Sequence, residues 1–143
     1  MRLALLPVLA VALAACQAQA VAPVPAANGP ASIVRVIDGD TFVLDGETIR
    51  IANLDAPESG NGAECPAEAM LAVEATSALE EIARLWAVKA PTVERQGRDR
   101  YGRTLARVSD PIHGDTGEAM IDKGWAVEWT GARFNWCGPI RPT

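Results

Sequence analysis

The sequence predicts an α+β fold that is mainly β, with five strands in a barrel and one long and one short helix packed against it. Three observations predict this class. Residues 33–54 form short segments of alternating, β-favouring side chains, residues 66–88 repeat apolar side chains at helical spacing, and two further strand-like segments follow. Short strands joined by turns, with one inserted helix, are typical of a small closed barrel such as the OB-fold.

Length and charge narrow the class of protein. The chain has 143 residues, enough for one domain, and its 49% apolar and 22% charged residues exclude a disordered or fibrous chain. Its formal net charge of -5 argues against a protein that coats nucleic acid with a broad basic surface. The charge is uneven, because residues 94–108 carry five arginines and two acids. A small arginine-lined cleft is therefore compatible with the composition.

Residues 1–20 predict a signal peptide rather than part of the fold. Arg2 precedes an apolar run over residues 3–13, which is too short for the roughly 20 residues of a membrane-spanning helix. The segment before Cys16 resembles the lipobox of bacterial lipoproteins, so we expect a lipid anchor on this cysteine. An Ala-x-Ala pattern would instead allow ordinary cleavage before Val21.

Residues 17–31 predict a flexible tether, because they are rich in Ala, Pro and Gln and contain few large apolar side chains. The folded domain is then expected over residues 32–143. The signal peptide predicts export from a bacterial cytoplasm to the periplasm or cell envelope, or secretion if no lipid is attached. Membrane contact is expected only through the anchor at Cys16, and the sequence implies no protein partner.

Strands are expected at residues 33–37, 41–44 and 48–51, where β-branched and apolar side chains alternate with polar ones. Asp45-Gly46 lies between the second and third strands, and this pair is the strongest short signal for a hairpin turn.

The long helix is expected over residues 66–88, with Pro66 in its first turn. Its apolar face is formed at spacings of three and four by Leu71, Ala75, Ala78, Leu79, Ile82 and Trp86.

Residues 92–94 and 104–108 predict two more strands. A short helix is expected at residues 118–122, and residues 125–129 predict a last extended segment.

Cys65 and Cys137 remain once the signal peptide is set aside, an even number in an exported chain. A disulfide between them would close a loop of about 70 residues and stabilise the fold by roughly 4 kcal/mol. The alternative is a pair of free buried thiols. His113 stands alone in a turn, so a zinc site has too few ligands.

Three segments carry charged residues that a barrel does not need: Val-Ile-Asp-Gly-Asp-Thr at 36–41, Arg-Ile-Ala-Asn-Leu-Asp-Ala-Pro-Glu at 50–58, and Arg-Asp-Arg-Tyr-Gly-Arg-Thr at 98–104. Each alone is compatible with an ordinary turn, a solvated acidic loop or surface ion pairs. Together, in this order and nearly this spacing, they resemble the signature segments of the staphylococcal nuclease (thermonuclease) family. The resemblance covers residues 32–127 and implies an OB-like barrel, calcium, and cleavage of DNA and RNA phosphodiesters.

The resemblance places Arg50, Glu58 and Arg103 on the family's catalytic residues. An arginine presents a planar fork of donors that matches a phosphate group. Burying Arg50 on an apolar strand is costly unless the charge is paired, which favours a functional role. Glu58 is the candidate to orient a water molecule and to accept its proton. Because a carboxylate is a weak base at neutral pH, we expect metal assistance and an alkaline preference.

The resemblance also implies a calcium site and a nucleotide site. Asp40 and Asp55 match the calcium-ligating carboxylates, and Ala56 matches a residue that contributes its backbone carbonyl. Calcium prefers oxygen ligands of this kind. Arg100 and Tyr101 match positions that line the nucleotide site, where they would contact a base or a phosphate.

The C-terminal segment departs from the family's pattern, in which further helices follow. We expect the Cys65–Cys137 bridge to fasten this segment to the start of the long helix in their place. Trp129 is a candidate base contact because the family carries aromatic residues near it. Two other functions stay open at this point: a catalytically inactive OB-like module that binds nucleic acid or another ligand, and a structural envelope lipoprotein.

Overall fold

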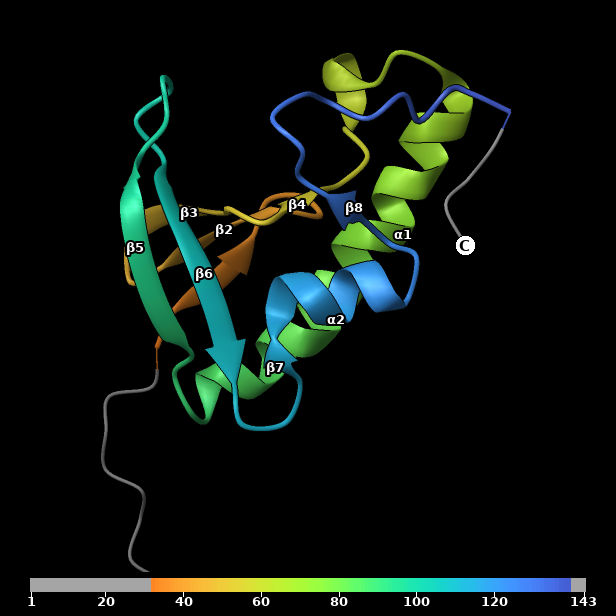
Figure 1. The fold of residues 1–143 in the computed structure, drawn as a ribbon. Helices are drawn as coiled ribbons and strands as arrows, with labels where there is room; N and C mark the ends of the chain where they lie inside the picture. Colours follow the sequence, from red (N-terminus) through yellow and green to blue (C-terminus); the bar gives the residue numbers. More distant parts are fainter. Residues whose placement is uncertain (1–31, 140–143) are drawn as a thin grey trace, which may run out of the picture.

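The computed structural model describes residues 32–139, and the expected signal peptide, Cys16 and the expected tether lie outside them. The main sheet has six strands, of which five follow the order β1-β2-β3-β6-β5, and the short β7 (Gly114–Asp115) pairs with β6 outside this order. The bounds of the five are β1 Val34–Val36, β2 Thr41–Leu44, β3 Glu47–Ile51, β5 Thr92–Arg98 and β6 Thr104–Asp110. Figure 1 shows the strands β2, β3, β5 and β6 on the left of the molecule and the helices α1 (Pro66–Ala83) and α2 (Thr116–Asp122) on the right. The predicted α+β class and the OB-like arrangement of five strands are confirmed.

One parallel pair joins the two halves of the sheet. β3 pairs with β6 in parallel, with Arg50 opposite Leu105, whereas the other neighbours in the sheet are antiparallel. In the described part of the chain β1 and β5 do not pair with each other, so the barrel is partly open, as in other OB-folds. The parallel pair brings the first residues of β6 beside the last residues of β3.

The predicted hairpin between β2 and β3 is confirmed. Asp45 and Gly46 have φ angles of 50° and 89°. Positive φ at both central residues is the requirement of a type I′ turn, whose twist matches that of the strands.

The long helix is shorter than predicted. α1 covers Pro66–Ala83, and the chain continues as a 3₁₀ helix, η2, over Arg84–Ala87. Turns of this tighter kind are frequent at the ends of α-helices. Here the turn carries Trp86, which is fully buried, packs 4.9 Å from the ring of Phe42, and donates a hydrogen bond from Nε1 to Asp110 (3.3 Å).

The remaining elements are short. They are β4 Leu54–Asp55, the 3₁₀ helix η1 Gly60–Gly62, β7 Gly114–Asp115, α2 Thr116–Asp122 and β8 Val127–Glu128. β4 pairs with β8, so the predicted extended segment at 125–129 reduces to two residues. The strand predicted at 92–94 extends to Arg98 through an irregularity at Gln96. Within the described residues no helix has both the length and the apolar composition needed to cross a membrane.

The core lies between the sheet and α1. Phe42, Ile49 and Ile51 contribute from the strands, and Leu79 and Trp86 contribute from the helical segment. Cys65 and Cys137 form the predicted disulfide, with Cα atoms 6.0 Å apart. Figure 1 shows the C-terminal segment, in dark blue, running toward the start of α1.

Candidate active site

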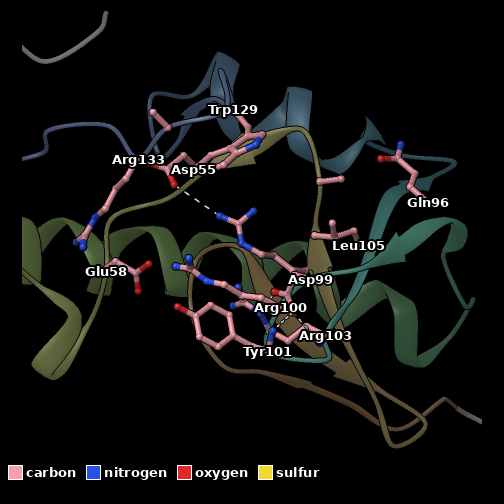
Figure 2. A pocket seen from close by; sticks show the side chains of 14 residues that line it. Asp55, Glu58, Gln96, Asp99, Arg100, Tyr101, Arg103, Leu105, Trp129 and Arg133 are labelled. Atoms are coloured by element: carbon pink, nitrogen blue, oxygen red, sulfur yellow. Dashed lines mark hydrogen bonds and ion pairs between the residues drawn. The ribbon is translucent and has the colours of Figure 1, made fainter.

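A cavity of about 820 Å³ opens where β3, the loop after β4, the β5–β6 turn and the C-terminal segment meet (Figure 2). Seven of the residues singled out in the sequence line it: Arg50, Asp55, Glu58, Arg100, Tyr101, Arg103 and Trp129. Segments that are far apart in the chain therefore meet in one place.

Arg50 projects from β3 into a nearly closed position, with 12% of its side chain exposed. Nη2 lies 2.8 Å from a carboxylate oxygen of Asp40 and 3.6 Å from one of Asp55. Nη1 donates to the carbonyls of Ile51 and Leu54, both at 3.4 Å. These partners satisfy the buried guanidinium and fix its orientation.

Asp40 connects two of the arginines that line the cavity, Arg50 and Arg103. Its other carboxylate oxygen accepts a hydrogen bond from the Thr41 hydroxyl at 2.6 Å, and that hydroxyl accepts from Nη1 of Arg103 at 3.2 Å. Burial raises the pKa of Asp40 to about 7, although the neighbouring Arg50 works in the opposite direction. A carboxylate in this position favours additional positive charge nearby.

The turn between β5 and β6 holds Arg103 and Tyr101. Asp99 accepts a hydrogen bond from Nε of Arg103 at 2.7 Å, and it also accepts from the backbone N–H groups of Tyr101 and Arg103. Burial works against the charged form of Asp99, but these hydrogen bonds outweigh it and hold its pKa below the usual value. The Tyr101 ring lies 4.9 Å from the guanidinium of Arg100 and 5.5 Å from that of Arg103.

Glu58 lines the cavity from the loop that follows β4. Its backbone N–H donates to the carboxylate of Glu68 at 3.1 Å. Figure 2 shows its side chain and that of Arg133 on the same side of the cavity. Arg133 comes from the C-terminal segment.

Asp40, Asp55 and Ala56 are all buried, and of the three only Asp55 lines the cavity. A Cβ atom added to Gly39 would be 2.8 Å from that of Ala56, so the turn before Asp40 packs directly against this residue. In the described residues no three His, Cys, Asp or Glu side chains gather closely enough to hold a metal by themselves. Two carboxylates and one carbonyl fit part of a calcium shell, with water and substrate phosphate as further oxygen ligands.

Sequence reasoning missed Asp99, Glu68 and Arg133, and it gave Trp129 only as a candidate. Trp129 lines the cavity with its ring 5.2 Å from the Arg50 guanidinium. For Arg133 a signal existed: it precedes Cys137 by four residues, and the predicted disulfide brings that segment to the start of α1.

A family model described as "Staphylococcal nuclease homologue" matches residues 48–135. The match covers more than half of the chain and includes two of the three signature segments. The chain belongs to this family. Membership confirms the resemblance stated from the sequence.

Curated relatives of this staphylococcal nuclease homologue agree with that assignment. A "Micrococcal nuclease" of Shigella flexneri is 32% identical over 140 residues, which cover 84% of this chain and 74% of the relative. An "Uncharacterized endonuclease" of Escherichia coli O157:H7 is 32% identical over 124 residues, 84% of this chain and 72% of the relative. "Succinoglycan biosynthesis protein ExoI" of Rhizobium meliloti (strain 1021) is 36% identical over 95 residues, 65% of this chain and 49% of the relative. The family and the two relatives named as nucleases together support a nuclease function.

Proposed function

We propose that this staphylococcal nuclease homologue is an exported, calcium-dependent nuclease that hydrolyses phosphodiester bonds of DNA, RNA or both. One observation carries the proposal. Arg50 and Arg103 reach one cavity, are linked through Asp40 and Thr41, and face that cavity together with Glu58. Two arginines and a carboxylate in one cavity are the groups that phosphodiester hydrolysis needs.

The two arginines would offset the negative charge that develops on the phosphate during the reaction. As a nucleophile attacks a phosphodiester, negative charge builds on the equatorial oxygens, and positive groups already in place stabilise it. Arg50 and Arg103 are held in place by Asp40 and Asp99. Because both side chains are already fixed, their N–H groups need not reorient as negative charge develops on the phosphate, whereas water molecules would have to.

Glu58 is the proposed general base. It would orient a water molecule and take its proton while Arg50 and Arg103 hold the phosphate. Calcium, when bound by Asp40, Asp55 and the Ala56 carbonyl, supplies positive charge to the phosphate and makes water easier to deprotonate.

The nucleotide would lie against the aromatic residues of the cavity. Tyr101 is 69% exposed, so its ring offers a free face to a base or sugar, and Arg100 next to it offers charge to a phosphate. Trp129 offers a second ring across from this turn, where stacking contributes about 1–3 kcal/mol per base.

Export is supported by the disulfide, because such bonds persist in oxidising compartments. The proposed route is a signal peptide over residues 1–20 with lipid attachment at Cys16 and residence in the periplasm or cell envelope. Secretion without a lipid is the alternative, and both leave the domain outside the cytoplasm.

The test is incubation of the purified domain with end-labelled single-stranded DNA and RNA, with calcium or with a chelator. We expect cleavage that requires calcium and that falls about 100-fold or more in Glu58→Ala and in Arg103→Lys. Arg84→Ala is the matched control, because this arginine is 73% exposed and does not line the cavity. Retention of the labelled strand without cleavage would instead indicate an inactive binding module, and neither cleavage nor retention would indicate a structural lipoprotein.

A further inference from the structure

Glu68, in the first turn of α1, is a buried carboxylate that does not line the cavity, with only 1% of its side chain exposed. Three groups donate to it: the backbone N–H of Glu58 at 3.1 Å, the backbone N–H of Glu64 at 2.7 Å, and Nη2 of Arg133 at 2.6 Å. Burial disfavours the charged form of Glu68, but these donors outweigh it and keep its pKa below the usual value. Glu68 is therefore an ionised group at the centre of a network.

The two backbone donors are the two ends of one loop. Residues 58–64 leave the cavity wall and return to the start of α1, and the two oxygens of Glu68 hold one end each. The side chain of Glu58 also lies against this loop, because a Cβ added to Gly62 would be 3.2 Å from its Oε2. The shape of the loop thus decides where the Glu58 carboxylate lies.

Arg133 completes the clamp from the C-terminal segment. Besides its bond to Glu68, it donates from Nη2 to the Gly62 carbonyl at 2.9 Å and lies 3.5 Å from the Glu64 carboxylate. Cys137 ties the same segment to Cys65. The charge of Glu68 is thus offset by an arginine that a covalent bond keeps nearby.

We propose that Glu68 is a positioning residue, which, together with Arg133, holds loop 58–64 so that the Glu58 carboxylate is aimed into the cavity. The inference rests on the proposed role of Glu58 as general base. Glu68 acts through Glu58 and has no contact with the Arg100–Tyr101 side of the cavity. We therefore expect its removal to slow the chemical step far more than it weakens substrate binding.

Glu68→Gln tests the clamp. A glutamine keeps the size of the side chain, but it has one acceptor oxygen where two N–H groups need one each, and it removes the nearer of the two carboxylates that pair with Arg133. We expect kcat to fall about 10- to 100-fold, because small displacements of a reacting group carry losses of this size. KM for a short single-stranded DNA is expected to stay within about threefold of the wild-type value.

A double variant separates positioning from a general loss of structure. In a Glu58→Gln background, Glu68→Gln should add no further loss of kcat, because the group through which it acts is already gone. The matched control is Glu74→Gln, a change at an exposed glutamate on the same helix, which should leave kcat unchanged. An equal fall in kcat in both backgrounds, or a rise in KM with kcat intact, overturns the inference.

Amide hydrogen exchange tests the clamp without any cleavage. We expect residues 58–64 to exchange at least tenfold faster in Glu68→Gln than in the wild type, and to be unchanged in Glu74→Gln. If Glu68→Gln does not fold, Arg133→Gln replaces it and should raise exchange in the same loop. Unchanged exchange overturns the inference. A wild-type domain that clamps the loop but cuts neither DNA nor RNA overturns the proposed function instead.

Discussion

Gly39 separates two carboxylates in the turn before β2, and its lack of a side chain is a structural requirement. A Cβ at this position would be 2.7 Å from the Cβ of Ala75 and 2.8 Å from that of Ala56. Contacts this short force the turn, α1 or the segment after β4 to move. The turn that carries Asp40 is therefore packed against both the helix and a proposed calcium ligand.

Gly39→Ala should lower the free energy of unfolding by about 1–3 kcal/mol, the usual effect of overpacking. Urea denaturation measures it. Gly138→Ala is the control, because a Cβ there meets its nearest neighbour, the Asn135 carbonyl, at an ordinary 3.4 Å. Equal midpoints for Gly39→Ala and the wild type would show that the turn can move away freely.

Some residues of the site can be identified from the sequence, and others only from the structure. Arg50 and Arg103 stand in local motifs, so the sequence alone indicates them, and the parallel pairing of β3 with β6 places both in one cavity. Glu68 has no such signal, because a glutamate in the first turn of a helix is favoured by the helix dipole in any protein. Its role depends on Arg133, which is 65 residues away in the chain.

At the scale of elements, Glu47 links three strands of the sheet. From β3, it accepts hydrogen bonds from Nε of Arg95 on β5 at 3.1 Å and from the Thr104 hydroxyl on β6 at 2.7 Å. These bonds lower the pKa of Glu47 from 4.5 to about 2. Because the folded-state pKa lies below the unfolded value, the stabilisation is complete above about pH 4.5 and is lost as the pH falls toward 2.

Glu47→Gln should therefore lower the free energy of unfolding by about 1 kcal/mol at pH 7, and the difference from the wild type should vanish near pH 2. Urea denaturation across this pH range measures it. Glu81→Gln provides the control, because both side chains of the Glu81–Arg84 ion pair are exposed. We expect this change to alter the free energy of unfolding by less than about 0.5 kcal/mol. A difference for Glu47→Gln that stays constant with pH contradicts the assignment.

Elements with a strong local pattern were predictable. The Asp45-Gly46 turn and the start of α1 at Pro66 follow from local chemistry. The end of α1 was not predictable, because the burial of Trp86 and its hydrogen bond to Asp110 favour the 3₁₀ turn that follows the helix. The pairing of β4 with β8 was not predictable either, since two-residue strands leave no periodic signal.

At the scale of the whole molecule, positive charge is concentrated at the cavity rather than spread over the surface. The chain carries a net charge of -5, yet four arginines line the cavity against three acids: Arg50, Arg100, Arg103 and Arg133 against Asp55, Glu58 and Asp99. A polyanion is therefore attracted to one place and repelled by much of the remaining surface. Such a surface favours brief contact and release over tight storage.

The Cys65–Cys137 bond holds the C-terminal segment beside this cavity. In that segment Phe134 donates its backbone N–H to Asp55, which lines the cavity, at 2.9 Å. Reduction should lower the free energy of unfolding by about 4 kcal/mol, since the bond spans 72 residues. Reduction should also lower nuclease activity at temperatures where the domain is still folded, because the C-terminal segment then loses its contact with Asp55. Thermal unfolding and activity are measured with and without reductant, and the Cys65→Ser/Cys137→Ser variant should be insensitive to reductant. An unchanged midpoint on reduction of the bridged protein would show that the segment packs without the bond.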